Sequence, residues 1–519
     1  MNHKNILKSS LALAASLLVL ATNHVCGADA PLDIGSRREL FVDDALVEKL
    51  TGKAELRLHH PVPQEIAIVH DAPWEGSACG YHSIFKDGDR YRMYYRGWQL
   101  TSKAGKLITN EHPTFGCYAE SKDGIRWTKP ELGLHEFKGS KANNIVFVGQ
   151  KIGKAMCDPT EGMSVFKDEN PAAEPDARYK AFVVGTFDRT YDKSRCTLFA
   201  FKSPDGLHWS PMSDTPVITD GMFDSQNLAF WDGTHGEYRA YWRFTGKTRI
   251  IRTATSKDFL HWEKQADLAY VDSPAEELYT NAVRPYQRAP HLLIGFPTRY
   301  IERGWSDSMH ALPEREHREL RANSGSERYG TAITEGLLMA SRDGVQFKRW
   351  NEAFLRPGIE RPGTWFYGDQ YIGWHVVETK SALEGAPNEL SLYATESYWA
   401  GSTSSALRRS TLRLDGFVSA QAPMSGGELI TKPLTFKGAR LALNFATSAA
   451  GSVRVEIQDV NGKALPGFAL EDCPPLFGDT IERTVTWKNG GDVSALASKP
   501  VRLRFALHDA DVYAFQFNP

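Results

Sequence analysis

The chain has 519 residues, a formal net charge of −2 and 41% hydrophobic residues. This composition is that of a folded globular protein and excludes a disordered chain. The small net charge, without any Lys/Arg-rich arm, argues against a nucleic-acid partner, because nucleic-acid-binding domains concentrate positive charge. The length predicts two or three domains, although one β-propeller can include several hundred residues.

The first thirty residues have the features of a secretory signal peptide. Lys4 and Lys8 precede an apolar run at 11–21, and small residues suited to cleavage follow at 27–30. The apolar run is too short to anchor the chain in a bilayer. We therefore expect an exported protein, periplasmic or extracellular, with no stable membrane span after cleavage.

The cysteine pattern does not indicate a metal site. Five cysteines follow the expected signal peptide, an odd number without a CxxC pair. This spacing argues against zinc. A core of this size needs no disulfide bonds, although one or two would be compatible with the count.

A phrase in which a strand runs into a turn and an aromatic residue recurs along the chain. It reads CYAESKDGIRW at 117–127, LFAFKSPDGLHW at 198–209, RTATSKDFLHW at 252–262, LMASRDGVQF at 338–347 and LYATESYW at 392–399. Ser and Asp bond the backbone of turns and Gly tolerates positive φ. We therefore interpret the aspartates of the phrase as structural, namely Asp123, Asp205, Asp258 and Asp343.

An apolar strand, a hairpin and an aromatic strand precede each copy of the phrase. Clear versions lie at 81–98, 163–185 and 227–244, and looser versions lie at 282–300 and 365–378. Each unit makes a sheet of roughly four strands, and five such sheets predict a five-bladed β-propeller. Two stacked sandwiches of unrelated strands are the alternative. The charged stretch 302–330 interrupts the fourth unit and is expected to form a solvated lid or rim, with a short helix as an option.

The pattern changes near residue 420. Cleanly alternating strands and an Asn461-Gly462 turn follow Gly427, which is typical of an antiparallel β-sandwich. The expected organisation is therefore all-β, with a signal peptide at 1–30, a catalytic five-bladed propeller at 31–420 and a sandwich at 421–519. We favour a bracing role for the sandwich over carbohydrate binding.

Acidic residues stand before the expected inner strand of every blade, where loops form the mouth of a propeller funnel. Glycoside cleavage needs two carboxyl groups across the scissile bond, one protonated and one ionised. The candidate catalytic residues are Asp158, Asp224, Glu277 and Glu75. The competing interpretation is that these acids bond the local backbone of turns.

Other residues at the same positions could bind a sugar. Aromatic rings stack on sugar faces, and amide, guanidinium and carboxylate groups fix hydroxyl groups. The candidate substrate-binding residues are Trp74, His82, Gln226, Tyr279, Asn281, Arg284, Trp365 and Asp369. A core position is the alternative for His82.

Residues 35–519 resemble exported bacterial proteins related to the N-terminal domain of glycoside hydrolase family 32, within the wider five-bladed group that includes family 43. The resemblance is carried by LFVDDALVE, TDGMFDSQNLAFWD, ELYTNAVRPY and the final strands. It implies three carboxylates from different blades. The WMNDPNG, RDP and EC motifs of family 32 are absent, so we assign roles by position. Asp158 and Asp224 are then the base or nucleophile and the tuning acid, and Glu277 is the general acid, with Glu75 as its rival.

The function expected from these observations is hydrolysis of glycosidic bonds in an oligosaccharide or polysaccharide. A glycan-binding propeller without catalysis is one alternative. A sialidase-like enzyme is another, although it needs three arginines and only Arg284 stands at an expected funnel position. No cofactor is expected. A structural calcium ion could bind among funnel carboxylates, but no motif indicates one.

Overall fold

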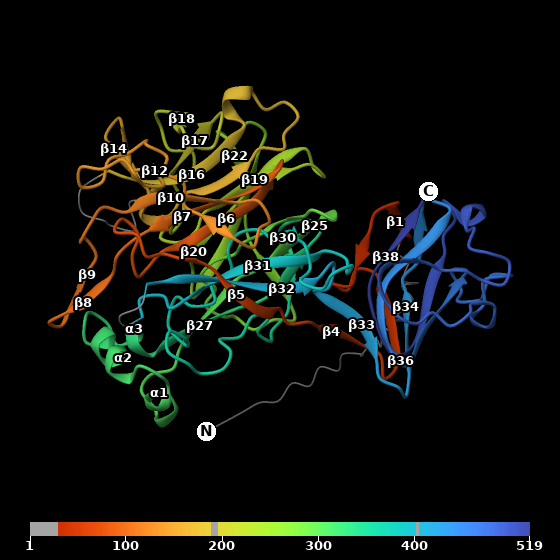
Figure 1. Ribbon diagram of the computed structural model, residues 1–519. Coiled ribbons are helices and arrows are strands. Elements are labelled where there is room, and N and C mark those ends of the chain that lie inside the picture. The colour runs from red at the N-terminus through yellow and green to blue at the C-terminus, as the bar shows by residue number, and fades with distance from the viewer. Residues whose placement is uncertain (1–29, 188–195, 401–403) are drawn as a thin grey trace, which may run out of the picture.

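The computed structural model describes residues 30–187, 196–400 and 404–519, which form two all-β lobes (Figure 1). Apart from Ala30, the predicted signal peptide at 1–30 lies outside the described residues. None of the helices in these ranges is long and apolar enough to cross a membrane.

The larger lobe consists of five sheets that follow one another along the chain. Blade one contains β6 (Gly80–Asp87), β7 (Arg90–Gly97), β10 (Phe115–Ser121), β11 (Trp127–Thr128) and β12 (Ile145–Phe147). Blade two contains β13 (Gln150–Ile152), β14 (Ala155–Asp158), β15 (Ser164–Lys167), β16 (Tyr179–Thr186), β17 (Thr197–Ser203) and β18 (Ser210–Pro211). Blade three contains β19 (Leu228–Asp232), β20 (Glu237–Thr245), β21 (Arg249–Ser256) and β22 (Trp262–Asp267).

The last two blades are completed by strands from elsewhere in the chain. Blade four contains β24 (Arg284–Tyr286), β25 (Ala289–Gly295), β28 (Met339–Ser341), β29 (Gln346–Arg349) and β23 (Ala269–Val271). Blade five contains β30 (Val377–Thr379), β31 (Glu389–Glu396), β32 (Ala406–Arg413) and β5 (Val62–Val69). Two hairpins project from blades four and one, namely β26 (Thr298–Glu302) with β27 (Ala332–Gly336), and β8 (Thr101–Lys103) with β9 (Lys106–Ile108).

The ring of blades is closed by the strand that precedes blade one. β5 pairs antiparallel with β32, so residues 62–69 and 406–411 share one sheet. Arg409 forms an ion pair with Glu65 across this seam. Because this pairing closes the ring of blades, no gap remains between the first and the last blade. The prediction of an all-β chain with a five-bladed propeller is confirmed.

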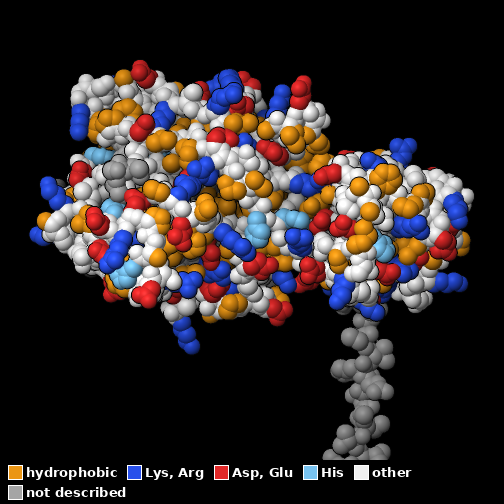
Figure 2. All heavy atoms as spheres, turned by 60° about the horizontal axis from the view of Figure 1, so that its bottom comes forward, with side chains coloured by type: hydrophobic (Ala, Val, Ile, Leu, Met, Phe, Trp, Pro, Cys, Tyr) orange, Lys and Arg blue, Asp and Glu red, His pale blue; other side chains and the backbone are white. Residues whose placement is uncertain are grey.

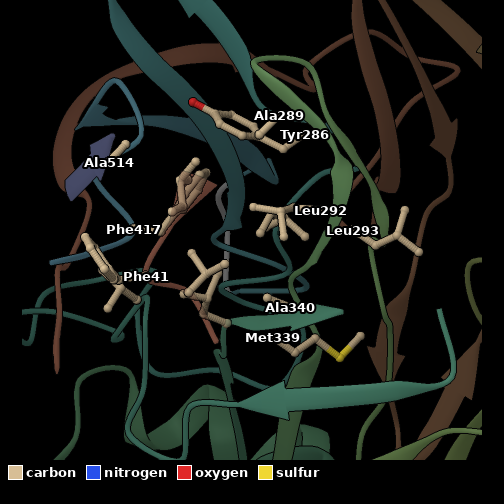
Figure 3. Close-up of a cluster of buried hydrophobic side chains, with 14 of the residues drawn as sticks. Phe41, Tyr286, Ala289, Leu292, Leu293, Met339, Ala340, Phe417 and Ala514 are labelled. Atoms are coloured by element: carbon tan, nitrogen blue, oxygen red, sulfur yellow. The ribbon is translucent and has the colours of Figure 1, made fainter. Parts of the chain in front are cut away.

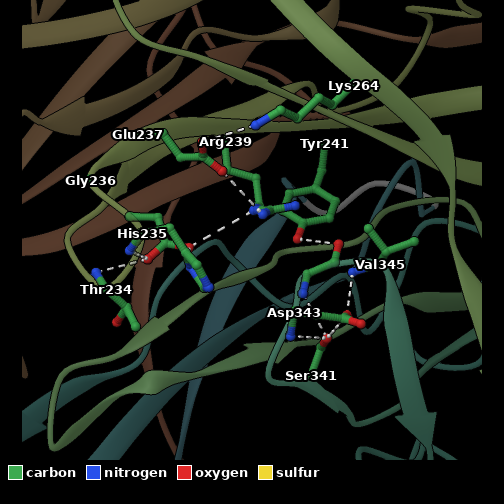
Figure 4. Close-up of polar contacts among 12 residues, drawn as sticks. Thr234, His235, Gly236, Glu237, Arg239, Tyr241, Lys264, Ser341, Asp343 and Val345 are labelled. Atoms are coloured by element: carbon green, nitrogen blue, oxygen red, sulfur yellow. Dashed lines mark hydrogen bonds and ion pairs between the residues drawn. The ribbon is translucent and has the colours of Figure 1, made fainter.

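The recurring phrase forms the same turn in four blades. In blade four, Ser341 Oγ accepts hydrogen bonds from the backbone N–H groups of Asp343 and Gly344, and Asp343 Oδ1 accepts from Val345 N at 2.8 Å (Figure 4). Ser121, Ser203 and Ser256 begin identical networks. The structural role predicted for Asp123, Asp205, Asp258 and Asp343 is confirmed.

Each of these turns also contacts the preceding blade. Tyr241 Oη of blade three donates to the carbonyl oxygen of Gly344 at 2.8 Å. Gly344 has φ +78°, and a Cβ atom there would lie 2.6 Å from the guanidinium carbon of Arg239. Only glycine adopts this positive φ without strain and also leaves room for the Arg239 guanidinium. In blade three Phe259 takes the glycine position at φ +68°, and its ring stacks on Phe182 of blade two at 5.1 Å.

The smaller lobe is an antiparallel domain built on two long strands. β36 (Arg440–Gln458) and β38 (Arg502–Asn518) pair along their whole length, with irregularities between Thr447 and Ser452 where both strands bend. Further C-terminal strands complete the domain, namely β33 (Val418–Ala422), β34 (Gly427–Thr431), β35 (Leu434–Phe436) and β37 (Asp479–Thr484).

The N-terminal part of the described chain also belongs to this smaller lobe. Its strands are β1 (Leu32–Gly35), β2 (Glu39–Leu40), β3 (Val47–Gly52) and β4 (Glu55–Leu58). They pair with β35, β38, β34 and β33 respectively. The sequence analysis assigned this segment to the propeller range 31–420. The structure differs because β38 has a free edge, which β2, β33 and β34 cover together.

The two lobes share one apolar core, shown in Figure 3. Phe41 and Ala514 of the smaller lobe are packed in the same buried cluster as Leu292 and Met339 of blade four, with Phe417 between the lobes. The cysteines Cys79, Cys117, Cys157 and Cys473 are buried free thiols. Packing and buried polar contacts therefore hold the lobes together.

A buried carboxylate stands at the centre of the polar contacts between the lobes. Asp415 is completely buried and accepts hydrogen bonds from Arg288 at 2.8 Å, Tyr286 Oη at 2.8 Å and Arg38 at 3.1 Å. Asn444 Nδ2 of the smaller lobe adds a fourth contact at 3.1 Å. Burial alone would raise the pKa of Asp415, but these donors hold it below its usual value.

The surface carries no large patch of one charge on the face shown in Figure 2. Acidic and basic side chains are interspersed there over both lobes. This distribution agrees with the formal net charge of −2.

Replacing the buried carboxylate should loosen the joint between the lobes. We expect Asp415→Ala to lower the free energy of unfolding by about 3–5 kcal/mol, because the partly buried Arg38 and Arg288 lose the buried carboxylate that they share. Urea unfolding followed by tryptophan fluorescence measures this loss. The control is Asp44→Ala, which removes a half-exposed partner of Lys348 near the same joint and should cost less than about 1 kcal/mol. Equal losses in the two variants would contradict the role given to Asp415.

Candidate functional site

Charged and aromatic side chains converge where the inner strands of the blades begin. From blade two, Glu161 lies 3.6 Å from Arg96 Nη1 of blade one. The Arg96 guanidinium covers the ring of Tyr81 at 4.4 Å and donates to Tyr398 Oη of blade five at 3.3 Å. Three blades thus meet around one buried guanidinium.

The other half of this arrangement is built by blades three to five. Asp224 and Arg243, both of blade three, form a close ion pair in which each side chain is at most 5% exposed. The Arg243 guanidinium lies 4.6 Å from the ring of Tyr279, which precedes the inner strand of blade four. Tyr371 then connects Tyr279 to Tyr398, with ring centres 5.5 Å and 6.5 Å away.

All five blades therefore contribute to one continuous set of side chains. We call it the funnel cluster, and it consists of Tyr81, Arg96, Glu161, Asp224, Arg243, Tyr279, Tyr371 and Tyr398. Two of its members, Asp224 and Tyr279, are site residues proposed from the sequence.

The phenols of the funnel cluster remain protonated near neutral pH. Burial, with the nearby charge of Glu161 and the phenol of Tyr279, raises the pKa of Tyr81 well above its usual value. Burial raises the pKa of Tyr398 to about 12. Protonated phenols can donate hydrogen bonds to hydroxyl groups, and their rings offer apolar faces to sugars.

Glu277 lies at the rim, less buried than the acids of the cluster. Its side chain is 35% exposed and accepts hydrogen bonds from Arg249 Nη1 at 2.8 Å and Arg249 N at 3.1 Å. The Arg249 guanidinium in turn lies 5.7 Å from the ring of Tyr279. Glu277 is thus joined to the funnel cluster through one arginine.

Asp158 and Glu75, the other two proposed catalytic acids, have local partners outside the cluster. Asp158 caps a short helical turn by accepting from Thr160 N at 2.8 Å. Glu75 is completely buried between blades one and five, where it bonds Tyr95 Oη at 2.5 Å and Lys129 Nζ at 2.6 Å. Its contacts occupy both carboxylate oxygens. The structure does not bring either residue to the funnel cluster.

Four of the proposed substrate-binding residues also have local contacts. Trp74 Nε1 donates to Asn144 Oδ1 at 2.6 Å, and His82 Nε2 lies 3.1 Å from His70 Nε2. Gln226 Nε2 donates to the His82 carbonyl oxygen at 3.3 Å. Asn281 Oδ1 accepts from Val283 N at 3.3 Å. These contacts connect neighbouring loops and blades.

The charged stretch 302–330 has buried side chains as well as exposed ones. It forms α1 (Asp307–Ala311), α2 (Arg315–Ala322) and α3 (Arg328–Thr331) beside blade five (Figure 1). Arg318 and Arg321 on α2 are completely buried. Arg318 donates to the carbonyl oxygens of Thr364 and Trp365 at 2.9 and 2.8 Å, which docks the helix on blade five. The expected solvated rim is therefore anchored by arginines that the loops of blade five bind.

Asp369 and Trp365 belong to this docked region. Asp369 is completely buried and accepts from Phe366 N at 3.0 Å and Tyr398 N at 2.9 Å. Burial raises the pKa of Asp369 to about 7, although these N–H groups and Arg321 oppose the shift. Trp365 Nε1 donates to Gly358 O at 2.9 Å. Asp369 thus fixes the backbone that carries Tyr398 into the funnel cluster.

Arg284 lies away from the funnel cluster, and the sequence analysis missed the arginines that do contribute to it. Arg284 faces the other end of the propeller, where it lies 3.3 Å from Glu169. Arg96 and Arg243 were overlooked, although both occupy the second strand of a blade in the similar phrases YYRGW and YWRFT. This shared position was the signal that could have identified them. Glu161 stands in the same loop as Asp158, and the sequence analysis chose Asp158 as the catalytic candidate of that loop.

Within the described ranges, no group of three or more His, Cys, Asp or Glu side chains has the arrangement of a metal site.

The comparisons with known proteins found similar structures only. No family model matches the chain, and no curated protein matches its sequence. A family 43 arabinoxylan arabinofuranohydrolase from Bacillus subtilis, solved with cellotetraose, is 13% identical, with a TM-score of 0.39 and coverage of 88% of this chain and 99% of that one. A family 32 β-fructofuranosidase from Bombyx mori is 10% identical, with a TM-score of 0.39 and coverage of 89% and 94%. An N-acetylgalactosamine deacetylase from F. plautii is 12% identical, with a TM-score of 0.41 and coverage of 69% and 94%.

The raised pKa of Asp369 predicts a specific dependence of stability on pH. Between about pH 4 and pH 7 the native carboxyl binds more protons than the unfolded chain, so its contribution to stability falls as the pH rises through that window. Asp369→Asn removes this contribution, on the order of 2 kcal/mol between pH 5 and pH 7. Thermal unfolding of both proteins at each pH measures it.

Comparing the two proteins separates the effect of Asp369 on the pH dependence of stability from the effect of buried His70. Burial lowers the pKa of His70 to about 4, so His70 adds stability as the pH rises from about 4 to 6.5, opposite in sign. Asp369→Asn retains the His70 contribution and should therefore gain stability, relative to the unchanged protein, on going from pH 5 to pH 7. An identical pH dependence in the two proteins would contradict the buried, partly protonated state of Asp369.

Proposed function

We propose that the chain is a glycoside hydrolase that cleaves an oligosaccharide or polysaccharide at the funnel cluster. The observation that carries the proposal is that Glu161 and Asp224, from adjacent blades, belong to one cluster, since Arg243 pairs with Asp224 and also feels the charge of Glu161. Paired carboxyl groups beside aromatic faces are what hydrolysis of a glycosidic bond requires.

The charge partners suggest a division of roles among the three acids. Arg96 lies beside Glu161 and Arg243 lies beside Asp224, so each of these carboxylates has a cationic partner. Asp224 is then the base or nucleophile, and Glu161 orients the sugar and tunes the local charge. Glu277 is the proton donor of this proposal. It is the most exposed of the three acids and lies at the rim, where an entering sugar would meet it.

A glycan-binding protein without catalysis is the second candidate. The observation that favours it is the pairing of each acid with an arginine, since Glu277 also contacts Arg249. Acids that serve mainly as partners of these arginines would hold the site together without taking part in proton transfer. The same tyrosines and arginines would bind sugar hydroxyl groups equally well.

Substitution of the paired acids distinguishes these functions. The test is release of reducing sugar from aryl-glycosides and from plant, algal and fructan polysaccharides. We expect Asp224→Asn and Glu161→Gln to lower the rate at least about 100-fold, because each removes a carboxylate from the reacting centre. Glu277→Gln should cause a loss of similar size for substrates with a poor leaving group.

The matched control is Asp158→Asn, three residues before Glu161 in the same loop. Asn caps a helix about as well as Asp, so this variant should keep its fold and nearly full activity. Activity that survives Asp224→Asn and Glu161→Gln would refute the assignment of the site. Glycan binding without release from any substrate would favour the binding protein.

A further inference from the structure

A cavity of about 870 Å³ opens at the opposite end of the propeller from the funnel cluster. Its lining includes Gly88 after β6, Glu169 after β15, and residues 282–287 in and around β24. The residues of the funnel cluster stand earlier along the same segments, with Tyr81 near the start of β6, Glu161 before β15 and Tyr279 before β24. The volume is within the range of small-molecule sites in proteins.

Trp374 separates the cavity from the funnel cluster. Its side chain is completely buried, and its indole Nε1 donates to the Val283 carbonyl oxygen of blade four at 2.9 Å. The ring also contacts Phe166 of blade two at 6.3 Å, while its backbone pairs with Ser83 of blade one. A residue that contacts three other blades through its side chain and backbone must lie near the axis. The two ends of the propeller are therefore distinct compartments.

Arg284 provides an unsatisfied cation in the wall of the cavity. Its side chain is 18% exposed, and its one ionic partner in the described structure is Glu169, at 3.3 Å from Nη2. Nη1 is buried and has no hydrogen-bond partner. A buried donor without an acceptor costs about 1–3 kcal/mol, more for charged groups, so this position favours an incoming acceptor.

His375 lies beside Arg284 and offers a neutral imidazole. The ring is buried against Trp374 at 4.3 Å, and neither ring nitrogen makes a hydrogen bond of normal geometry. Burial, reinforced by the charge of Arg284, holds the pKa of His375 well below its usual value. One ring nitrogen can therefore donate to a ligand at neutral pH.

The rest of the lining suits a small acid with an apolar face. Buried apolar residues form the inner part, and lysines and acids form the mouth. The apolar residues are Phe85, Ile294, Phe296 and Val377, and the lysines are Lys86, Lys122 and Lys380.

We propose that this cavity is a second ligand site, which binds a small carboxylate-bearing molecule such as a sugar acid. The carboxylate accepts hydrogen bonds from Arg284 Nη1 and from the His375 ring. Its charge replaces the weak, exposed contact of Arg284 with Glu169. Guanidinium–carboxylate pairs of this kind are strong when partly buried. The site is independent of the hydrolytic proposal, because it lies behind Trp374.

Calorimetric titration of the whole protein with D-glucuronate and D-glucose tests the proposal, since the two probes differ only at the carboxylate carbon. We expect D-glucuronate to bind and D-glucose to bind at least 10-fold more weakly, as loss of a charge-assisted hydrogen bond implies. Arg284→Gln should weaken D-glucuronate at least about 10-fold, and Arg126→Gln, which changes an arginine 91% exposed, should leave it unchanged.

Glu169→Gln provides a second test that does not depend on the fold tolerating a change at Arg284. Glu169 is exposed and competes with the ligand for Arg284, so its removal should strengthen D-glucuronate binding several-fold. Activity at the funnel cluster should not change in this variant. The proposal is overturned if D-glucuronate does not bind, or if its affinity is the same in Glu169→Gln as in the unchanged protein.

Discussion

The pairing of β5 with β32 is the constraint on which the rest of the structure depends. The chain enters the propeller through its last blade, so residues near 65 and residues near 409 must meet before blade five is complete. This is contact between segments more than 300 residues apart, and such pairing costs considerable loop-closure entropy. Once it forms, each blade has a neighbour on both sides, and the turn of each recurring phrase can pack against the blade before it.

The closed ring creates the funnel cluster and also limits its chemistry. Its acids come from adjacent blades: Asp224 pairs with Arg243 of its own blade, whereas Glu161 of blade two pairs with Arg96 of blade one. The arginines that support them, Arg96 and Arg243, lie on second strands and extend inward over tyrosine rings. The result is a site in which each of the two carboxylates has an arginine partner, and in which burial raises the pKa of Tyr81, Tyr371 and Tyr398. In the proposed hydrolysis the proton donor is the rim residue Glu277, which is more exposed than the acids of the cluster.

The fold could be predicted largely from the sequence because the same turn contacts recur in the blades and require the same residue types at short spacing. Ser, Asp and Gly bond or shape the turn within six residues, and that pattern identified four blades directly. The fifth blade and the strands at 39–58 were harder, since the pairing of β5 with β32 and of β2 with β38 depends on distant segments. Phe259 shows the same limit, because it stands at the glycine position of the phrase and stacks on Phe182 of the preceding blade, a contact that the local pattern does not predict.

The site was only partly predictable for a related reason. Asp158 and Glu161 are three residues apart, and only the capping geometry shows that one bonds the backbone while the other reaches Arg96. Arg284 was placed near the sugar, yet its position along the inner strand directs it toward the opposite end of the propeller. Sequence pattern identifies which strand a residue occupies, but not how far along the axis its side chain lies.

The most direct test of the account is amide hydrogen exchange of Asp224→Asn with an oligosaccharide that the unchanged protein cleaves. If all five blades build one glycan site, exchange should slow together at 80–84, 160–164, 223–227, 279–283 and 369–373. Protection confined to one blade, or to the smaller lobe, would contradict the claim that the five blades jointly hold the sugar.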